Sequence, residues 1–264
     1  MVIISGKFLR RNTKDIATRK RGQGKGDITD IDAQPGLLYY GRMPRTARAS
    51  VGGVWYHVLN RGNRREAVFH ESGDYDAFVE AIIDARTRLP LDILGYCLMP
   101  NHFHLVIRPQ SDGDLGRWVQ WLLMAHARRY HRHYRTSGHV WQGRFKAFPI
   151  QDDDHLRTVV RYVERNALRA ELVARAEDWK WSSLPRWVCR DPILWRGKPE
   201  VRDRFWLARV NKPLSDGDLH RLRVSAERGR PFGDEAWVRE TARRLGLEST
   251  LRSRGRPRKE TSPD

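Results

Sequence analysis

The order in which two hydrophobic periodicities follow one another between residues 54 and 168 constrains this chain more than any other feature. Short stretches rich in β-branched and aromatic residues, closed by turn signals, predict strands at residues 54–60, 91–98, 102–108 and 144–150. Longer stretches with an apolar residue every three or four positions predict helices at residues 72–88, 114–134 and 153–168. The order β-α-β-β-α-β, followed by a helix, predicts an α+β fold with a ferredoxin-like core and an antiparallel sheet. Helices would cover one face of this sheet and leave the other face free for function.

The segments on either side of this core differ from it in composition. Residues 1–42 are rich in Lys, Arg and Gly and show little periodicity, which predicts a disordered basic N-terminal extension. Met43 is an alternative start of the protein. Residues 186–264 are predicted to form a basic helical extension that binds DNA, with short helices within residues 213–246.

The net charge points to a polyanionic partner. The 264 residues carry a formal charge of +18 and have a pI of about 10.6, and each Lys or Arg that neutralises a phosphate releases condensed counterions. A surface adapted for solubility is the alternative. The two cysteines, Cys97 and Cys189, have neither metal-ligand spacing nor a disulfide pattern, and no apolar run approaches the roughly 20 residues of a membrane span. With no signal peptide recognisable, we expect a cytoplasmic, nucleoid-associated protein.

A pair of histidines on the third predicted strand is the sharpest local signal. His102 and His104 are separated by Phe103, so both imidazoles project from the same face, about 7 Å apart along the strand. Such a pair can bind one divalent cation, although an incidental pair on a sheet surface is the alternative. Its position just after the Pro100-Asn101 turn, at a sheet edge, favours the metal site. His57, on the neighbouring first strand, is interpreted as structural or as approaching the same site.

Tyr162 and Asn166 are four residues apart on the helix predicted at residues 153–168 and therefore share one flank of it. A boundary tyrosine beside a surface asparagine is the alternative. A phenol is a poor nucleophile at neutral pH because its pKa is about 10, but a cation that polarises a phosphate offsets this weakness. Two imidazoles and a carboxamide oxygen would hold Mg²⁺ or Mn²⁺ with positions left open for phosphate oxygens. The tyrosine would then form a covalent phosphotyrosine, which keeps the bond energy needed for rejoining.

Five runs of sequence resemble, in the same order, the single-tyrosine HUH transposases (IS200-like), and most of all the REP-associated tyrosine transposases: YHVLNRGNRRE, GYCLMPNHFHLVI, GHVWQGRFKAFPI, RYVERNALRAELV and WKWSSL. The resemblance covers about residues 43–185, the expected catalytic domain. It implies a ferredoxin-like core, a divalent metal, single-stranded hairpin DNA as substrate, and cleavage that leaves a 5′-phosphotyrosine and a free 3′-OH. His102 and His104 match the HUH motif, Tyr162 the nucleophile, and Asn166 the polar residue that helps to bind the metal in relatives.

The chain departs from this family at one position near the site. The family often has Asn-Pro where this sequence has Asn166-Ala167. Because proline helps to end a helix, its absence is expected to lengthen the helix slightly, without removing a catalytic group.

Several basic and aromatic side chains are candidates for holding DNA. They are Arg61, Arg64, Arg65, Arg128, Arg129, Arg132, Trp141 and Arg144 in the core, and Arg254 and Arg256 in the tail. Trp141 and Arg144 pair an aromatic ring with a cation, which suits stacking on unpaired bases. A solvated charged face is the alternative for the arginines, and a core position is the alternative for Trp141. The tail around Arg254 and Arg256 resembles an AT-hook, whose arginines insert into a narrow minor groove; a generic basic tail is the alternative.

Other functions remain compatible with parts of this pattern. A catalytically inactive or domesticated DNA-binding regulator would share the scaffold, but it has no need to keep all four candidate residues. A metal-dependent hydrolase that uses water predicts further carboxylate ligands, and Asp112 and Asp114 have no obvious ligand spacing. A rolling-circle initiator or relaxase shares the chemistry but usually has a different motif order and a longer chain. Monomer and homodimer both fit the sequence, as do attack by Tyr162 within its own subunit and across subunits.

Overall fold

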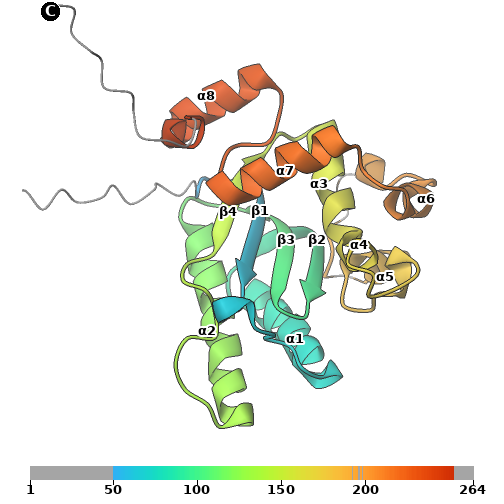
Figure 1. The fold of residues 1–264 in the computed structure, drawn as a ribbon. Helices are drawn as coiled ribbons and strands as arrows, with labels where there is room; N and C mark the ends of the chain where they lie inside the picture. The colour runs from blue at the N-terminus through green and yellow to red at the C-terminus, as the bar shows by residue number, and fades with distance from the viewer. Residues whose placement is uncertain (1–49, 192, 196, 198, 253–264) are drawn as a thin grey trace, which may run out of the picture. The chain divides into compact units, whose positions relative to one another are not determined.

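The computed structural model describes residues 50–252 apart from residues 192, 196 and 198 (Figure 1). The predictions for residues 1–42 and for Arg254 and Arg256 lie outside the described residues. All described residues belong to one compact unit. None of the helices in this described part is long and apolar enough to cross a membrane.

Four strands form one fully antiparallel sheet. They are β1 (Trp55–Arg61), β2 (Leu91–Met99), β3 (His102–Pro109) and β4 (Lys146–Ile150). The strand order is β2-β3-β1-β4, and β1 and β3 pair along their length with Arg61 opposite His102 and Leu59 opposite His104. This order and the intervening helices confirm the ferredoxin-like prediction. The fourth strand begins at Lys146, slightly later than predicted, so Arg144 lies in the segment before it.

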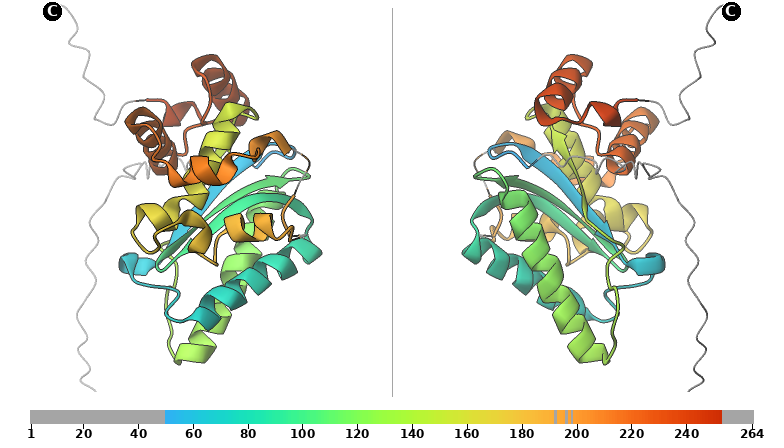
Figure 2. Two further views of the ribbon diagram at one scale, coloured as in Figure 1. Left: turned by 90° about the vertical axis from the view of Figure 1, so that its right-hand side faces the viewer. Right: turned by 90° about the vertical axis from the view of Figure 1, so that its left-hand side faces the viewer.

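Two long helices cover one face of the sheet. Figure 2 shows α1 (Ser72–Arg88) and α2 (Asp114–Tyr134) together on that side. Because strand side chains alternate between faces, every second residue of the strands joins these helices in a first core. Its fully buried members include Tyr56, Val58, Phe78, Phe103, Leu105, Trp118 and Leu122.

The other face of the sheet is covered as well, which corrects the expectation that it would be open. Helix α3 (Asp154–Glu164) packs across β2, β3 and β4 and buries a second core. This core includes Trp55, Val106, Phe148, Leu156, Val159 and Val163, and apolar side chains of this kind on both faces require cover from water. Helix α3 ends at Glu164, and Arg165 separates it from α4 (Asn166–Arg169), so Ala167 does not prolong one continuous helix.

Beyond α4, the described chain forms an extension of further short helices. Its helices are α5 (Ser183–Val188), α6 (Trp206–Asn211), α7 (Asp216–Arg228) and α8 (Glu235–Leu245). Its 3-10 turns are Ala176–Asp178, Pro199–Val201 and Glu248–Thr250. A separate 3-10 turn, Asn63–Arg65, follows β1. Leu222 of α7 and Phe232 in the α7–α8 connection belong to the second core. The extension is therefore packed onto the sheet.

A buried ion pair joins this extension to the end of α3. The side chains of Glu164 and Arg202 are both fully buried, with Arg202 Nη2 donating to Glu164 Oε1 at 2.6 Å. The same carboxylate accepts hydrogen bonds from Ser183 Oγ at 2.6 Å and from Trp206 Nε1 at 2.7 Å. The carboxylate thus has a counter-charge and several donors, which is the condition for burying a charge.

Candidate active site

The strand pairing brings three imidazoles to the second face of the sheet. His102 and His104 lie two positions apart on β3, and their ring centroids are 5.0 Å apart. His57 comes from the neighbouring strand β1, and its Nε2 lies 2.8 Å from Nδ1 of His104. His57 and His104 are buried, and His102 is half-buried.

The hydrogen bonds of these rings leave one nitrogen of each candidate ligand free. His102 Nδ1 lies 2.6 Å from Oδ1 of Asn101, and because this oxygen can only accept, Nδ1 carries the proton and Nε2 keeps its lone pair. The bond between His57 Nε2 and His104 Nδ1 can run in either direction, and in the tautomer with the proton on His104 Nδ1 the Nε2 of His104 is free. Both candidate ligands can therefore present Nε2 to a cation.

Burial keeps these imidazoles uncharged at neutral pH. It lowers the pKa of His102 to about 4, with Arg61 and Arg169 contributing further through their positive charge. The pKa of His104 lies well below its usual range, first because of burial and then because of the neighbouring histidines. Burial alone lowers the pKa of His57 to about 3. A neutral imidazole is the form that binds a metal.

The predicted nucleophile lies against these histidines. The Tyr162 ring on α3 is edge-on to His104 and His57, with centroid distances of 5.7 and 6.1 Å. The Cζ atom of Arg169, on α4, lies 5.6 Å from the centroid of the Tyr162 ring. The structure therefore brings the imidazole pair and the phenol together, with a guanidinium beside the phenol.

Asn166 lies next to this group but is turned into the protein. It is fully buried, and its Oδ1 accepts a hydrogen bond from Arg169 Nη2 at 2.8 Å. Its Nδ2 has no hydrogen-bond partner among the described residues. Metal ligation by Asn166 stays a prediction, since its oxygen would have to exchange Arg169 for the cation.

One cavity of about 610 Å³ contains the histidine pair and the tyrosine. Its lining residues come from β1, β3, the segment leading into β4, α3, α4 and α7: Leu59, Asn60, Arg61, His102, His104, Gln142, Arg144, Lys146, Tyr162, Arg169, Arg223, Ala226 and Glu227. Five of these side chains are Lys or Arg, and one is acidic. The cavity is therefore suited to a strongly anionic ligand.

The predicted DNA-binding residues fall into two groups. Arg61 and Arg144 line the cavity. Arg64 and Arg65 are exposed in the turn after β1, and Arg128 and Arg132 are exposed on α2, which lies on the opposite face of the sheet.

Two other residues predicted to bind DNA, Arg129 and Trp141, instead make contacts within the protein. Arg129 donates to Asp74 Oδ1 at 2.8 Å and to the Gly73 carbonyl at 3.1 Å, so it ties α2 to the start of α1. Trp141 is 7% exposed and packs at centroid distances of 5.3 Å from Phe103 and 5.0 Å from His126. Base stacking by Trp141 is thus contradicted, and the alternative, a core position, is correct because its ring fills space in the first core.

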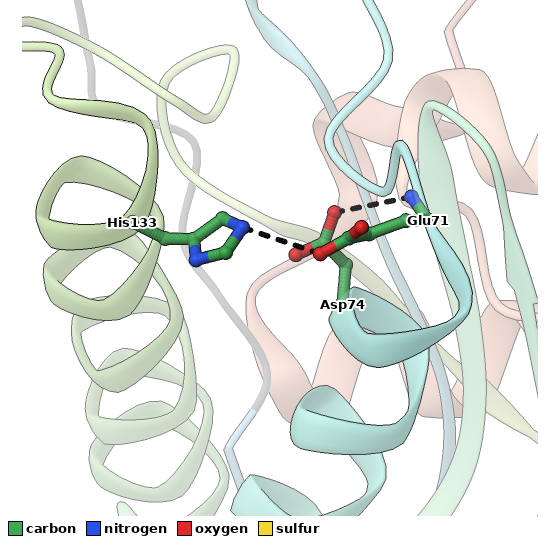
Figure 3. Close-up of side chains that lie close together, drawn as sticks. All are labelled: Glu71, Asp74 and His133. Atoms are coloured by element: carbon green, nitrogen blue, oxygen red, sulfur yellow. Dashed lines mark hydrogen bonds and ion pairs between the residues drawn. The ribbon is translucent and has the colours of Figure 1, made fainter. Parts of the chain in front are cut away.

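A second ionisable cluster, remote from the cavity, has a structural explanation. Glu71, Asp74 and His133 lie close together where α1 begins beside α2 (Figure 3). Glu71 and Asp74 form a reciprocal capping box, and the Asp74 carboxylate also accepts from Tyr134 and Arg129. Although burial opposes its charge, these hydrogen bonds lower the pKa of Asp74 to about 2. The cluster caps α1 and joins the two helices.

Sequence reasoning missed the cavity residues that come from distant segments. Lys146 lies on a predicted strand, where alternation places it on the same face as Phe148, so a signal for it existed. Arg223 and Glu227 belong to a helix some sixty residues beyond Tyr162 in the sequence, and no local pattern links them to the site.

Comparison with known proteins finds similarity to transposases. Residues 50–166 match the family described as "Transposase IS200 like". The chain is 28% identical over 150 residues to the REP-associated tyrosine transposase of Escherichia coli K12, a match that covers 55% of this chain and 86% of that protein. A solved structure of a REP-associated tyrosine transposase bound to a REP hairpin aligns with a TM-score of 0.48 and 24% identity, over 66% of this chain and all of that chain. Residues 50–166, somewhat less than half of the chain, are therefore similar to an IS200-like transposase domain.

Proposed function

We propose that this protein is a metal-dependent transposase that cleaves and rejoins single-stranded DNA through a 5′-phosphotyrosine on Tyr162. The observation that carries the proposal is the convergence of His102, His104 and Tyr162 in one cation-lined cavity. The match of residues 50–166 to a transposase family supports the reaction class, because strand cleavage followed by rejoining is what transposition requires.

The donor set at the histidine pair fits a divalent cation. His102 and His104 each offer a neutral Nε2, and Asn166 would add an amide oxygen after releasing Arg169. Mixed nitrogen and oxygen donors with open positions suit Mg²⁺ or Mn²⁺. When bound, such a cation polarises the scissile phosphate and stabilises the charge that develops on its oxygens. His57 orients His104 through the hydrogen bond between their rings.

The protein side chains carry out the remaining steps. The Tyr162 hydroxyl oxygen attacks phosphorus, so that the Tyr O–P bond forms and the bond from phosphorus to the 3′-oxygen breaks. The phenolic proton is balanced by the proton that the departing 3′-oxygen takes up, which yields a free 3′-OH. Attack of a 3′-OH on the phosphotyrosine reverses these changes and joins strands without ATP. Arg169 lies beside the phenol, where it stabilises the anionic form of the attacking oxygen.

The substrate we propose is a single strand that carries a hairpin. Tyr162 is only 9% exposed, and the cavity around it has walls on several sides, so the reacting phosphate must enter between protein elements. A flexible unpaired strand can do so, whereas the phosphates of a duplex are held on a rigid helix. Arg61, Arg144 and Lys146 line the cavity and can bind the flanking phosphates. A REP-type hairpin is the specific candidate, because the chain is 28% identical over 150 residues to a REP-associated tyrosine transposase.

Covalent adduct formation tests this function. The protein is incubated with a labelled single-stranded hairpin oligonucleotide and Mg²⁺ or Mn²⁺, then analysed under denaturing conditions. We expect a protein–DNA adduct that disappears with EDTA and in Tyr162→Phe. Tyr130→Phe is the matched control, because Tyr130 hydrogen bonds to His70 on α2's side of the sheet and should leave the adduct unchanged.

Two results would refute specific parts of the proposal. An adduct of equal yield in Tyr162→Phe would exclude this nucleophile. Equal cleavage of a duplex would exclude the single-strand substrate. If the wild-type protein bound the hairpin tightly but gave no adduct under any metal condition, the inactive DNA-binding regulator would be the correct function.

A further inference from the structure

Helix α7 supplies one wall of the catalytic cavity. Arg223, Ala226 and Glu227 of this helix line the same cavity as His102 and Tyr162. All three lie beyond residues 50–166, the segment that matches the transposase family. The site of this chain therefore contains side chains that the matched domain alone does not provide.

The pattern of α7 explains why these side chains point into the cavity. Leu222 is buried in the second core, and Leu219 and Ala226 pack against it from the same side of the helix. Arg223 and Glu227 are exposed and four residues apart, so they share the neighbouring flank. Burying the apolar stripe against the sheet thus turns this charged flank toward the cavity.

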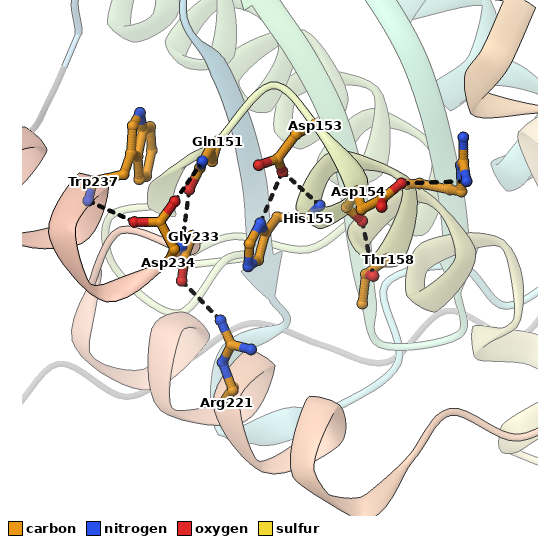
Figure 4. Close-up of polar contacts among 10 residues, drawn as sticks. Gln151, Asp153, Asp154, His155, Thr158, Arg221, Gly233, Asp234 and Trp237 are labelled. Atoms are coloured by element: carbon orange, nitrogen blue, oxygen red, sulfur yellow. Dashed lines mark hydrogen bonds and ion pairs between the residues drawn. The ribbon is translucent and has the colours of Figure 1, made fainter.

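The α7–α8 connection holds this wall against the sheet (Figure 4). Phe232 pairs with the end of β4: its N–H donates to the Pro149 carbonyl at 2.9 Å, and its carbonyl accepts from Gln151 N–H at 2.9 Å. The Gln151 side chain donates to the Asp234 carboxylate at 2.7 Å and accepts from the Asp234 backbone N–H at 2.8 Å. Arg221 closes the arrangement by donating to the Gly233 carbonyl at 2.7 Å. Because these bonds attach residues 232–234 to the end of β4, and Arg221 attaches α7 to the same segment, α7 is held in place beside the site.

The charges around the cavity are unbalanced. Four cationic side chains of the cavity lining form no ion pair within the described part of the chain. They are Arg61, Arg144, Lys146 and Arg223. Glu227 is the acidic residue of the lining, and it likewise has no ion-pair partner among those residues. Cations gathered without counter-charges repel one another, and a bound polyanion relieves this repulsion.

We propose that α7 is part of the DNA-binding cleft, with Arg223 contacting a backbone phosphate of the single strand whose scissile phosphate lies at Tyr162. Glu227, one turn further along the helix, repels phosphate and so limits the path that the strand can follow. This inference rests on the proposed function, and it makes the C-terminal extension a direct contributor to substrate binding at the catalytic site.

Binding measurements in the absence of catalysis test this role. Fluorescence anisotropy of a labelled hairpin oligonucleotide with single-stranded flanks is measured in EDTA at several salt concentrations, in a Tyr162→Phe background. Loss of one charge-assisted hydrogen bond in Arg223→Ala should raise the dissociation constant about tenfold. Loss of one phosphate contact to a single strand should also reduce the slope of log affinity against log salt by about 0.7.

Two further variants make the measurement decisive. Arg117→Ala removes the same charge from α2, on the opposite face of the sheet, and should change the dissociation constant by less than about twofold. Glu227→Gln removes the repulsive charge and should lower the dissociation constant by about threefold, since one exposed charge is worth well under a tenfold change. It also provides a second test if Arg223→Ala proves unstable in a thermal melt.

The inference is overturned if Arg223→Ala matches Arg117→Ala in both dissociation constant and salt slope, or if Glu227→Gln weakens binding. This outcome is separable from failure of the proposed function. A normal adduct from the wild-type protein, together with an unchanged salt slope in Arg223→Ala, would refute only the role of α7. Absence of the adduct, together with the expected change in slope, would refute the chemistry and leave α7 as a DNA-binding element.

Discussion

Replacing Arg202 by methionine should destabilise this protein strongly, because Arg202 forms a buried ion pair at the end of α3. The substitution keeps much of the side-chain volume but removes the counter-charge of Glu164, whose side chain is fully buried. It removes two of the four hydrogen bonds to that carboxylate and leaves those from Ser183 and Trp206. The remaining carboxylate would be a buried charge without an ionic partner.

The size of the effect follows from this burial. Removing one member of a buried ion pair typically lowers the free energy of unfolding by about 3–5 kcal/mol. In a domain of about 150–250 residues, each kcal/mol corresponds to about 2–4 °C in melting temperature, so the expected decrease is roughly 6–20 °C. Replacing both partners, as Glu164→Leu with Arg202→Met, should recover part of this loss because no buried charge is then left.

Urea unfolding followed by tryptophan fluorescence, together with thermal melts, measures these differences. Arg239→Met is the matched control, because it breaks an ion pair with Glu235 in which both side chains are more than half exposed. Such a pair contributes at most about 0.5 kcal/mol. If Arg202→Met stayed within 1 kcal/mol of the wild type, the reasoning that this pair anchors the end of α3 would be wrong.

Two more predictions concern the histidine site and the acid response. In His57→Leu, the affinity for Mn²⁺ measured by titration calorimetry should fall by about 10- to 100-fold, because His104 loses the ring that orients it; an unchanged affinity would show that His57 only fills space. The hydrogen-bonded Asp74 has its pKa lowered to about 2 from an ordinary 3.8, so its stabilisation is present above about pH 4 and is lost as the pH falls toward 2. This pKa difference corresponds to about 2 kcal/mol in the free energy of unfolding, which urea titration measures. Asp74→Asn should lose stability at neutral pH and respond less to acid, and an identical acid response in both proteins would contradict the assignment.

Much of the core and the centre of the site could be inferred from local patterns. Period-two alternation put His102 and His104 on one face of a strand, and the antiparallel sheet confirms the strand itself. The apolar stripe of the last core helix put Tyr162 on its flank, where the structure places it against His104. Both inferences succeed because the relevant neighbours are a few residues apart and the element type determines where they point.

Local patterns failed where a side chain had two plausible environments. Trp141 next to basic residues suited base stacking, but an indole also fills a gap between Phe103 and His126, and only packing distinguishes the two. The second face of the sheet was expected to be open, but the helices that follow the β-α-β-β-α-β order along the chain cover it. Their apolar stripes identify them as packed helices without indicating which surface they cover.

The amino-acid sequence by itself determined the strand and helix order, the histidine pair, the helical flank of Tyr162 and the basic character of the whole chain, since each depends on periodicity or composition. Tertiary structure alone decided that His57 hydrogen bonds to His104, that Asn166 is turned toward Arg169, and that α7 lines the cavity around Tyr162. The physical reason is that these contacts join segments whose separation along the chain carries no periodic signal. They arise when two apolar faces, far apart in sequence, are buried against the same sheet.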